Sequence, residues 1–181
     1  MAENHRRKST AAVALICRRQ DGEAQWLARW NKHWKCYYFV GGHKRDDETF
    51  FDCLVREIKE ELGISAEQDF TVAPQPLAHL EYVAWSRSAK AETEYTVEVY
   101  GVKPETEYTV EFFDVRFIDD AIRERIQSKQ ALRWLNEAEI RGQRCSDGLP
   151  VSETMARLLD ELGWKCPSCQ SVAGTPAGKG G

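Results

Sequence analysis

The pattern of apolar and polar residues predicts one clear amphipathic helix in the first third of the chain. Between Thr49 and Leu62 the apolar residues recur every three or four positions, which places them on one face of a helix. These residues are Phe51, Leu54, Val55, Ile58 and Leu62. Gly63 follows where a C-cap glycine is expected, and the acidic residues at 46–48 suit the positive end of the helix dipole.

The sequence before this helix predicts two strands joined by a tight turn. Residues 10–19 hold a short apolar run bounded by charged residues, as in a buried strand. Asp21-Gly22 is a strong turn signal, and residues 24–30 read as the returning strand. Residues 31–39 are rich in aromatic and basic side chains, which fits either a loop or the start of another strand.

The sequence after the helix is mainly strand-like. Two near-copies, EYTVEVYGV at 94–102 and EYTVEFFDV at 107–115, alternate with a period of two, and KPET between them favours a turn, so we expect an antiparallel hairpin. Further elements are expected as strands at 77–85 and 131–135, a polar loop at 86–92, a short helix or loop at 136–140, and helices at 119–130 and 152–164. This order predicts an α+β fold in which a sheet lies between helices, an α/β/α sandwich.

The length of 181 residues fits one domain with tails better than two domains. We place the domain at 10–165, after a flexible basic tail at 1–9. Residues 166–181 are rich in Gly, Pro and Ser, and we expect a second flexible tail there.

The composition excludes several classes of protein. A formal net charge of −4 argues against a nucleic-acid binder, although a bound cation would still let the chain take a small anionic substrate. The apolar run AAVALIC is too short for a signal peptide or a membrane span. Six scattered cysteines are too few for a disulfide scaffold, so we expect a cytoplasmic protein with reduced thiols.

Three glutamates on the predicted helix suggest a metal site. Glu57, Glu60 and Glu61 stand at positions i, i+3 and i+4, which gathers them on one face. Their mutual repulsion would be relieved by a divalent cation such as Mg²⁺, which binds a few carboxylates and the phosphates of a substrate. A solvated acidic face, paired with Arg56 and Lys59, is the alternative for this segment taken alone.

The whole segment from Gly42 to Ile64 resembles the complete signature of the Nudix hydrolase family. Gly42 is followed after five residues by Glu48, and after seven more by the Arg56-Glu57 pair. The remaining signature residues are Ile58, Glu60, Glu61, Gly63 and Ile64. The flanking segments also look like the family, over roughly Thr10–Trp164. One departure is Val40, because the family often has proline before the glycine pair.

This resemblance implies a fold, a reaction and roles for residues. The fold would be a mixed sheet flanked by helices, and the reaction would be hydrolysis of a pyrophosphate in a nucleoside diphosphate linked to another moiety, with Mg²⁺ or Mn²⁺. Glu57, Glu60 and Arg56 would form the catalytic set, and Arg56 with Glu48 would orient the metal ligands. The metal ligands would be Glu57, Glu60, Glu61 and the Gly42 carbonyl. The general base would be one of these glutamates or a later-loop residue, for which the candidates are Glu92 and Glu94.

The substrate is less well defined by the sequence. Trp30, Trp34 and Tyr37 are candidates for stacking on a base, and the basic residues Lys32, Lys35 and Arg45 for contacting phosphates. The alternative for the aromatic residues is a place in the core. Tyr82 stands near the position of a tyrosine that marks dinucleoside polyphosphate hydrolases, but it fits a strand equally well. His43, after the glycine pair, is expected to be a loop residue because Mg²⁺ prefers oxygen ligands.

The cysteines near the C-terminus raise a further possibility. Cys166 and Cys169 resemble half of a zinc ribbon, with Cys145 as a candidate third ligand. The alternative is a frayed tail with two thiols. The alternatives to an enzyme are a Nudix-fold sensor that binds a nucleotide without cleaving it, and an adaptor domain acting through this tail. The expected partner is a small nucleotide, with no membrane or nucleic acid, and a homodimer is left open.

Overall fold

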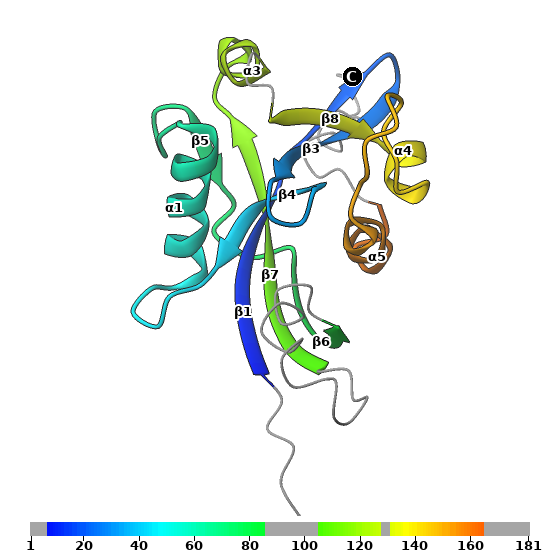
Figure 1. The fold of residues 1–181 in the computed structure, drawn as a ribbon. Helices are drawn as coiled ribbons and strands as arrows, with labels where there is room; N and C mark the ends of the chain where they lie inside the picture. Colours follow the sequence, from blue (N-terminus) through cyan, green and yellow to red (C-terminus); the bar gives the residue numbers. More distant parts are fainter. Residues whose placement is uncertain (1–6, 86–104, 128–130, 165–181) are drawn as a thin grey trace, which may run out of the picture.

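A computed structural model describes residues 7–85, 105–127 and 131–164 of the chain. These residues form a mixed sheet with helices on both faces (Figure 1). The strands are β1 (Arg7–Leu15), β2 (Cys17–Gln20), β3 (Glu23–Asn31), β4 (Cys36–His43), β5 (Phe70–Val72), β6 (Ala78–Trp85), β7 (Glu105–Phe117) and β8 (Leu132–Asn136). The helices are α1 (Phe50–Leu62), α3 (Asp120–Gln127), α4 (Glu137–Arg141) and α5 (Glu153–Glu161). The α+β prediction is therefore confirmed.

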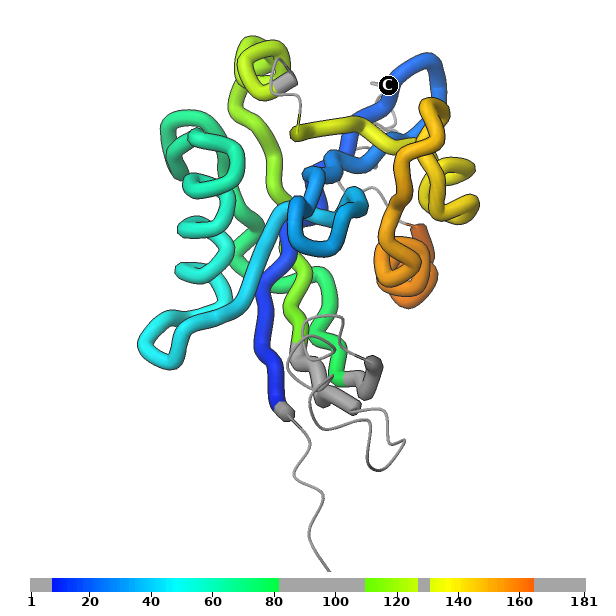
Figure 2. The backbone as a smooth tube through the Cα atoms, in the orientation of Figure 1, coloured from blue at the N-terminus to red at the C-terminus, as the bar shows by residue number. Residues whose placement is uncertain are grey.

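The long strands β1, β4 and β7 cross the centre of the molecule (Figure 2). The strand order is β2-β3-β4-β1-β7-β5, with β6 paired to β7 and β8 paired to β3. The β1–β7 pair is parallel and the other strand pairs are antiparallel. The sheet is therefore mixed, and its parallel pair joins segments about a hundred positions apart in sequence.

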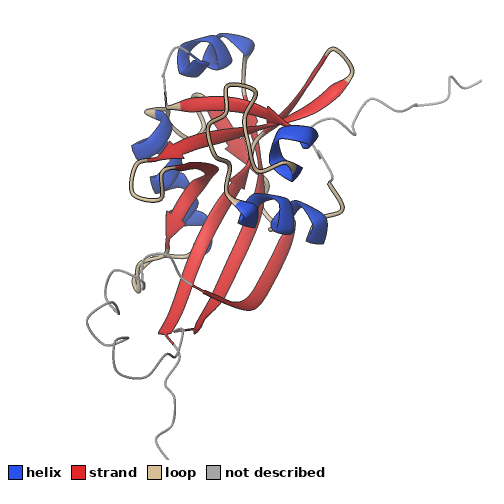
Figure 3. Ribbon diagram, turned by 45° about the vertical axis from the view of Figure 1, so that its right-hand side comes forward, coloured by secondary structure: helices blue, strands red, loops and turns tan. Residues whose placement is uncertain are grey.

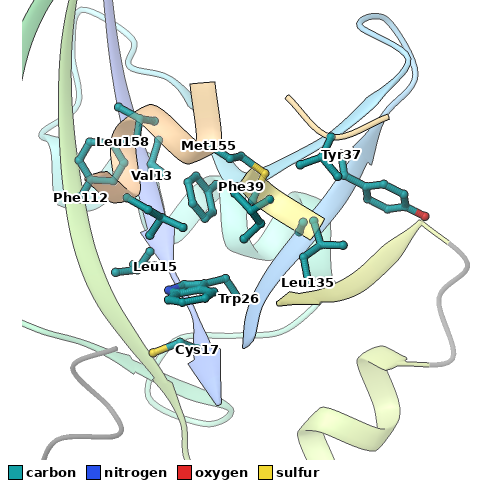
Figure 4. Close-up of a cluster of buried hydrophobic side chains, with 14 of the residues drawn as sticks. Val13, Leu15, Cys17, Trp26, Tyr37, Phe39, Phe112, Leu135, Met155 and Leu158 are labelled. Atoms are coloured by element: carbon teal, nitrogen blue, oxygen red, sulfur yellow. The ribbon is translucent and has the colours of Figure 1, made fainter. Parts of the chain in front are cut away.

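Each face of the sheet carries its own apolar cluster, because successive side chains of a strand point to opposite faces. Figure 4 shows the first cluster, in which Trp26 and Phe39 of the sheet meet Met155 and Leu158 of α5. The second cluster packs α1 and α3 against the other face, through residues such as Leu54 and Ile126. Figure 3 shows helices on both sides of the strands. This is the α/β/α sandwich that the sequence predicted.

Helix α1 begins and ends where the sequence signals place it. The Thr49 hydroxyl accepts a hydrogen bond from the Asp52 N–H, and the Asp52 carboxylate accepts one from the Thr49 N–H, which makes a capping box. Gly63 ends the helix in the left-handed conformation, with φ 66°. Phe51 departs from the predicted apolar stripe, since it is 41% exposed while Cys53 is buried. The buried face is therefore rotated by a fraction of a turn toward Cys53.

Other boundaries differ from the sequence-based predictions. Strand β1 begins at Arg7, inside the segment expected to be a tail. The second of the two near-copies lies in β7, which pairs with β1 and β6. Glu105 and Thr106 of the predicted turn already belong to this strand, while the rest of the turn and the first copy lie outside the described residues. The short segment at 136–140 is helical, capped by Asn136, and helix α5 ends at Glu161, three residues early.

Two expectations about location can be compared with the structure. No helix among the described residues is long and apolar enough to cross a membrane. The thiols of Cys53 and Cys145 are free, whereas Cys17 is disulfide-bonded, so the expectation of reduced thiols is wrong for Cys17.

Candidate functional site

The glycine pair brings the end of β4 against helix α1. Gly41 has φ 143°, and a Cβ atom there would lie 2.3 Å from the Ala12 carbonyl oxygen of β1. A Cβ atom on Gly42 would lie 2.4 Å from the Glu57 Oε1 atom. The two glycines therefore remove the bulk that would otherwise separate the strand from its neighbour on one side and from the helix carboxylate on the other.

Arg56 is the centre of the polar contacts on this helix. Its Nε and Nη2 atoms donate to the two carboxylate oxygens of Glu48, at 3.0 and 2.7 Å. Its Nη1 atom donates to Glu57 at 2.6 Å and to Glu60 at 3.5 Å, and Nη2 also donates to the His43 carbonyl at 3.1 Å. The hydrogen bonds from Arg56 lower the pKa of the Glu48 carboxyl to about 2, so this two-point pair stays ionised at neutral pH.

Glu61 lies on the inner side of the acidic cluster, with its side chain 13% exposed. Its carboxylate accepts a hydrogen bond from the Gly41 N–H at 3.2 Å and another from the Arg29 guanidinium at 2.7 Å. Burial raises the pKa of the Glu61 carboxyl to about 7, although the charge of Arg29 and the bond from Gly41 oppose the rise. Glu57 and Glu60 add to the rise by repulsion.

Glu60 faces solvent on the same side of the helix. Its side chain is 54% exposed, compared with 14% for Glu57. Besides its long contact with Arg56, it has Arg45 at 3.9 Å. The predicted set of glutamates is therefore brought together on one face. The exposure of the side chains increases across this cluster. Glu61 and Glu57 lie largely buried against the strand, and Glu60 lies exposed at the rim.

The carboxylate oxygen atoms of this cluster are suitable ligands for a hard divalent cation. Carboxylate oxygens are the ligands that Mg²⁺ prefers, and the missing side chain at Gly42 leaves room for Glu57 over the strand. Arg56 and Arg29 hold the carboxylates, and no three acidic, histidine or cysteine side chains of the described residues converge in a metal-binding geometry. The Gly42 carbonyl accepts a 3.5 Å contact from the Cys53 thiol. Glu57, Glu60 and Glu61 would hold the cation once their arginine contacts rearrange.

Two of the predicted aromatic residues, Trp30 and Tyr37, lie on the face of the sheet opposite α1. Trp30 and Tyr37 pack edge to face at 5.2 Å and belong with the first cluster, on the face opposite α1. Tyr37 is buried, with its hydroxyl directed away from the cluster (Figure 4). These positions agree with the alternative given for the aromatic residues, a place in the core. The reason is strand alternation, which turns them away from the helix.

Trp34 pairs with an aromatic residue that was not predicted and that also packs against the first cluster. Its ring packs edge to face on Tyr38 at 5.4 Å. Tyr38 pairs directly with Arg29 across the β3–β4 ladder, so the two side chains share a face. Since Arg29 contacts Glu61, the chain Trp34–Tyr38–Arg29–Glu61 links half-exposed aromatic rings to the acidic cluster.

Sequence reasoning missed four residues of this site: Arg29, Tyr38, Gly41 and Cys53. The signal for Arg29 was its place two residues after Leu27 on a strand, which puts it on the face covered by α1. Gly41 could have been noticed as the first member of a glycine pair. Its close approach to Ala12 could not, because it depends on the pairing of β4 with β1. Nothing in the local sequence marks Cys53 as a neighbour of the Gly42 carbonyl.

Most of the remaining predicted residues lie away from the acidic cluster or outside the described part of the chain. Glu92, Glu94, Cys166 and Cys169 lie outside the described residues. Cys145 is a buried free thiol in the first cluster. His43 ends β4 instead of lying in a loop, and its Nδ1 atom is 3.0 Å from the Ser9 hydroxyl.

The comparisons with known proteins agree with this geometry. The family model described as the NUDIX domain matches residues 8–155. The crystal structure of a C. elegans Ap4A hydrolase is similar with a TM-score of 0.53 and 18% identity, over 86% of this chain and 96% of that one. The MutT protein of Methanosarcina mazei Go1 gives a TM-score of 0.51 and 15% identity, over 88% and 96%. No curated protein matches the sequence.

A third solved structure is similar over part of its length. Shewanella oneidensis NrtR gives a TM-score of 0.55 and 12% identity, over 84% of this chain and 60% of that one. At identities this low, these likenesses show a shared fold.

Proposed function

Because the chain belongs to the Nudix family, we propose that it hydrolyses the pyrophosphate bond of a nucleoside diphosphate linked to another moiety, with Mg²⁺ or Mn²⁺. The observation that carries this proposal is the cluster of Glu57, Glu60 and Glu61, held against the glycine pair by Arg56 and Arg29. A bound divalent ion would neutralise the phosphates and acidify a water molecule.

The chain's own residues then have separate tasks in the proposed reaction. The oxygen of a water molecule attacks one phosphorus, the bond from that phosphorus to the bridging oxygen breaks, and the bridging oxygen leaves with the other phosphate. A carboxylate of the acidic cluster accepts the proton from the water. Glu48 holds Arg56 by two hydrogen bonds, and Arg56 in turn positions Glu57.

The proposal is tested by incubating the chain with a panel of nucleotides and measuring metal-dependent release of nucleoside monophosphate or phosphate. A sensor that binds nucleotides without cleaving them is the competing function. It would bind members of the panel and release no product. The complete set of signature carboxylates favours the enzyme over the sensor, because a sensor has no need of all three.

Arg56→Lys is expected to lower turnover by about 10- to 100-fold, the range seen when groups that orient metal ligands are changed. A lysine keeps the positive charge but cannot donate two parallel hydrogen bonds to Glu48 and a third to Glu57. Steady-state kinetics over a range of Mg²⁺ concentrations would detect the loss. Arg125→Lys, which alters a guanidinium paired with Asp69 away from the cluster, serves as the control. Equal activity of the two variants would contradict the positioning role.

Trp34→Ala and Tyr38→Ala are expected to raise KM for nucleotide substrates, with a smaller change in kcat. Stacking on a base contributes about 1–3 kcal/mol per base, which corresponds to a rise of roughly 5- to 150-fold. Trp30→Phe is the matched control, since its ring faces the opposite side of the sheet. Kinetics of the three variants on one nucleotide would measure the difference. A larger KM effect from Trp30→Phe would show that the base binds elsewhere.

A further inference from the structure

Two arginines and a tryptophan lie together between α3 and the sheet, away from the acidic cluster. The guanidinium carbon of Arg18 lies 4.4 Å from the centre of the Trp134 ring. Arg123 of α3 is close enough for its charge to act on Arg18, whose pKa is lowered first by burial and then by this neighbour. Figure 1 shows α3 beside β8, the strand that carries Trp134, and the two elements are in contact.

Strand pairing explains how these side chains meet. Arg18 of β2 is opposite Gln25 of β3, and Trp134 of β8 is opposite Leu27 of β3. Gln25 and Leu27 are two residues apart, so all four side chains share the face that α3 covers. Arg18 and Trp134 are therefore diagonal neighbours across β3.

Two polar atoms of this group lack hydrogen-bond partners in the described part of the chain. Arg123 Nε and Trp134 Nε1 are both buried without a hydrogen-bond partner among the described residues. Arg18 Nε donates to the neutral Gln25 side chain at 2.9 Å, and no carboxylate of the described residues pairs with Arg18. Arg123 Nη1 donates to the Asp120 carboxylate at 2.7 Å. Two guanidinium charges thus face one carboxylate, next to two unsatisfied N–H groups.

We propose that Arg18, Arg123 and Trp134 form a binding site for the phosphate group of a small molecule. A phosphate offers acceptor oxygens to the guanidinium groups in a geometry that arginine matches, and its negative charge offsets their mutual repulsion. It also gives an acceptor to a buried indole N–H, which is costly to leave unsatisfied. The site needs no metal, in contrast to the acidic cluster.

The test is a titration of the isotope-labelled full chain with inorganic phosphate, in EDTA and at constant ionic strength. EDTA prevents phosphate from binding at the glutamates through a metal, so the result does not depend on the proposed hydrolysis. The indole N–H resonance of Trp134, assigned with Trp134→Phe, is expected to move and saturate with a dissociation constant on the order of 1 mM. A second titration with a nucleoside monophosphate shows whether free phosphate or a nucleotide is the better source.

Two variants and a matched control decide the outcome. Arg18→Gln and Arg123→Gln are each expected to weaken phosphate binding by at least about 10-fold, since each removes a charge-assisted contact. Arg19→Gln, one residue along and on the opposite face of β2, should bind as the parent chain does. Melting temperatures measured without phosphate identify any variant that fails to fold. If Arg18→Gln fails to fold, Arg18→Lys is used in its place. Overturning results are an unmoved Trp134 resonance or equal weakening in Arg19→Gln.

Discussion

Replacing Glu60 or Glu61 with glutamine is expected to lower turnover by at least about 100-fold, because even groups that only orient metal ligands cost about 10- to 100-fold when changed. An amide binds Mg²⁺ more weakly than a carboxylate and cannot accept a proton from water. The fold should survive, since Glu60 is exposed and removing one of three neighbouring negative charges relieves repulsion. Initial rates at saturating Mg²⁺ measure the loss.

The control for these variants is Glu161→Gln, at the exposed end of α5. It removes the same charge from the opposite face of the sheet and should leave turnover unchanged. In EDTA, the melting temperatures of Glu60→Gln and Glu61→Gln should equal or slightly exceed that of the parent chain. Near-normal activity of both variants would show that these carboxylates do not hold the metal.

Gly41→Ala is expected to lower the free energy of unfolding by roughly 2 kcal/mol or more, the scale of a side chain forced into a disfavoured backbone conformation. Alanine rarely adopts φ 143°, and its Cβ atom would lie 2.3 Å from the Ala12 carbonyl oxygen. Relief of this clash must move β4 away from β1, and with it the N–H that donates to Glu61. Chemical denaturation would measure the change in stability.

Gly22→Ala is the matched control for Gly41→Ala. Gly22 also has positive φ, at 84°, but a Cβ atom there would meet no atom within 4 Å. Its cost is therefore conformational strain alone, about 1–2 kcal/mol. If Gly41→Ala destabilises no more than Gly22→Ala and keeps full activity, the close approach of β4 to β1 does not position the cluster.

The acidic helix could be predicted from the sequence because its signals are local. The apolar spacing, the acidic residues before it and Gly63 after it all lie within about two dozen positions. The sequence analysis placed Phe51 on the buried face of the helix, where it does not lie. An apolar spacing of three or four residues does not determine how wide the buried face is. Cys53, a small residue with weak apolar character, takes part of that face instead.

The contacts that Arg29 and Tyr38 make in the site depend on the pairing of distant segments, which cannot be predicted from a single sequence. Arg29 meets Glu61 because β3 and β4 pair in one register, with Arg29 opposite Tyr38. A shift of one residue would have turned Trp30 and Tyr37 toward the helix. The aromatic residues of this segment therefore indicated a contact surface, but not the face of the sheet on which it lies.

The two near-copies show the same limit for the fold. Their alternation identified strands correctly for the second copy, which lies in β7. Adjacent strands in sequence usually pair with each other, which favoured a hairpin. The described part of β7 instead pairs with β1 in parallel and with β6 in antiparallel orientation. The pairing partners of a strand depend on the whole sheet, so they cannot be predicted from the strand's own alternation of apolar and polar residues.

The central claim is that water hydrolyses a pyrophosphate in a reaction that depends on the acidic cluster and a divalent ion. It is tested most directly by incubating the full chain with a panel of nucleoside diphosphates linked to other moieties, in ¹⁸O-water, with Mg²⁺ or with EDTA. With Mg²⁺, at least one substrate should yield two phosphate-bearing products, one of which carries a single ¹⁸O atom. EDTA should abolish the reaction. Failure to cleave any substrate with Mg²⁺ or Mn²⁺, or equal cleavage in EDTA, would contradict the proposed hydrolysis.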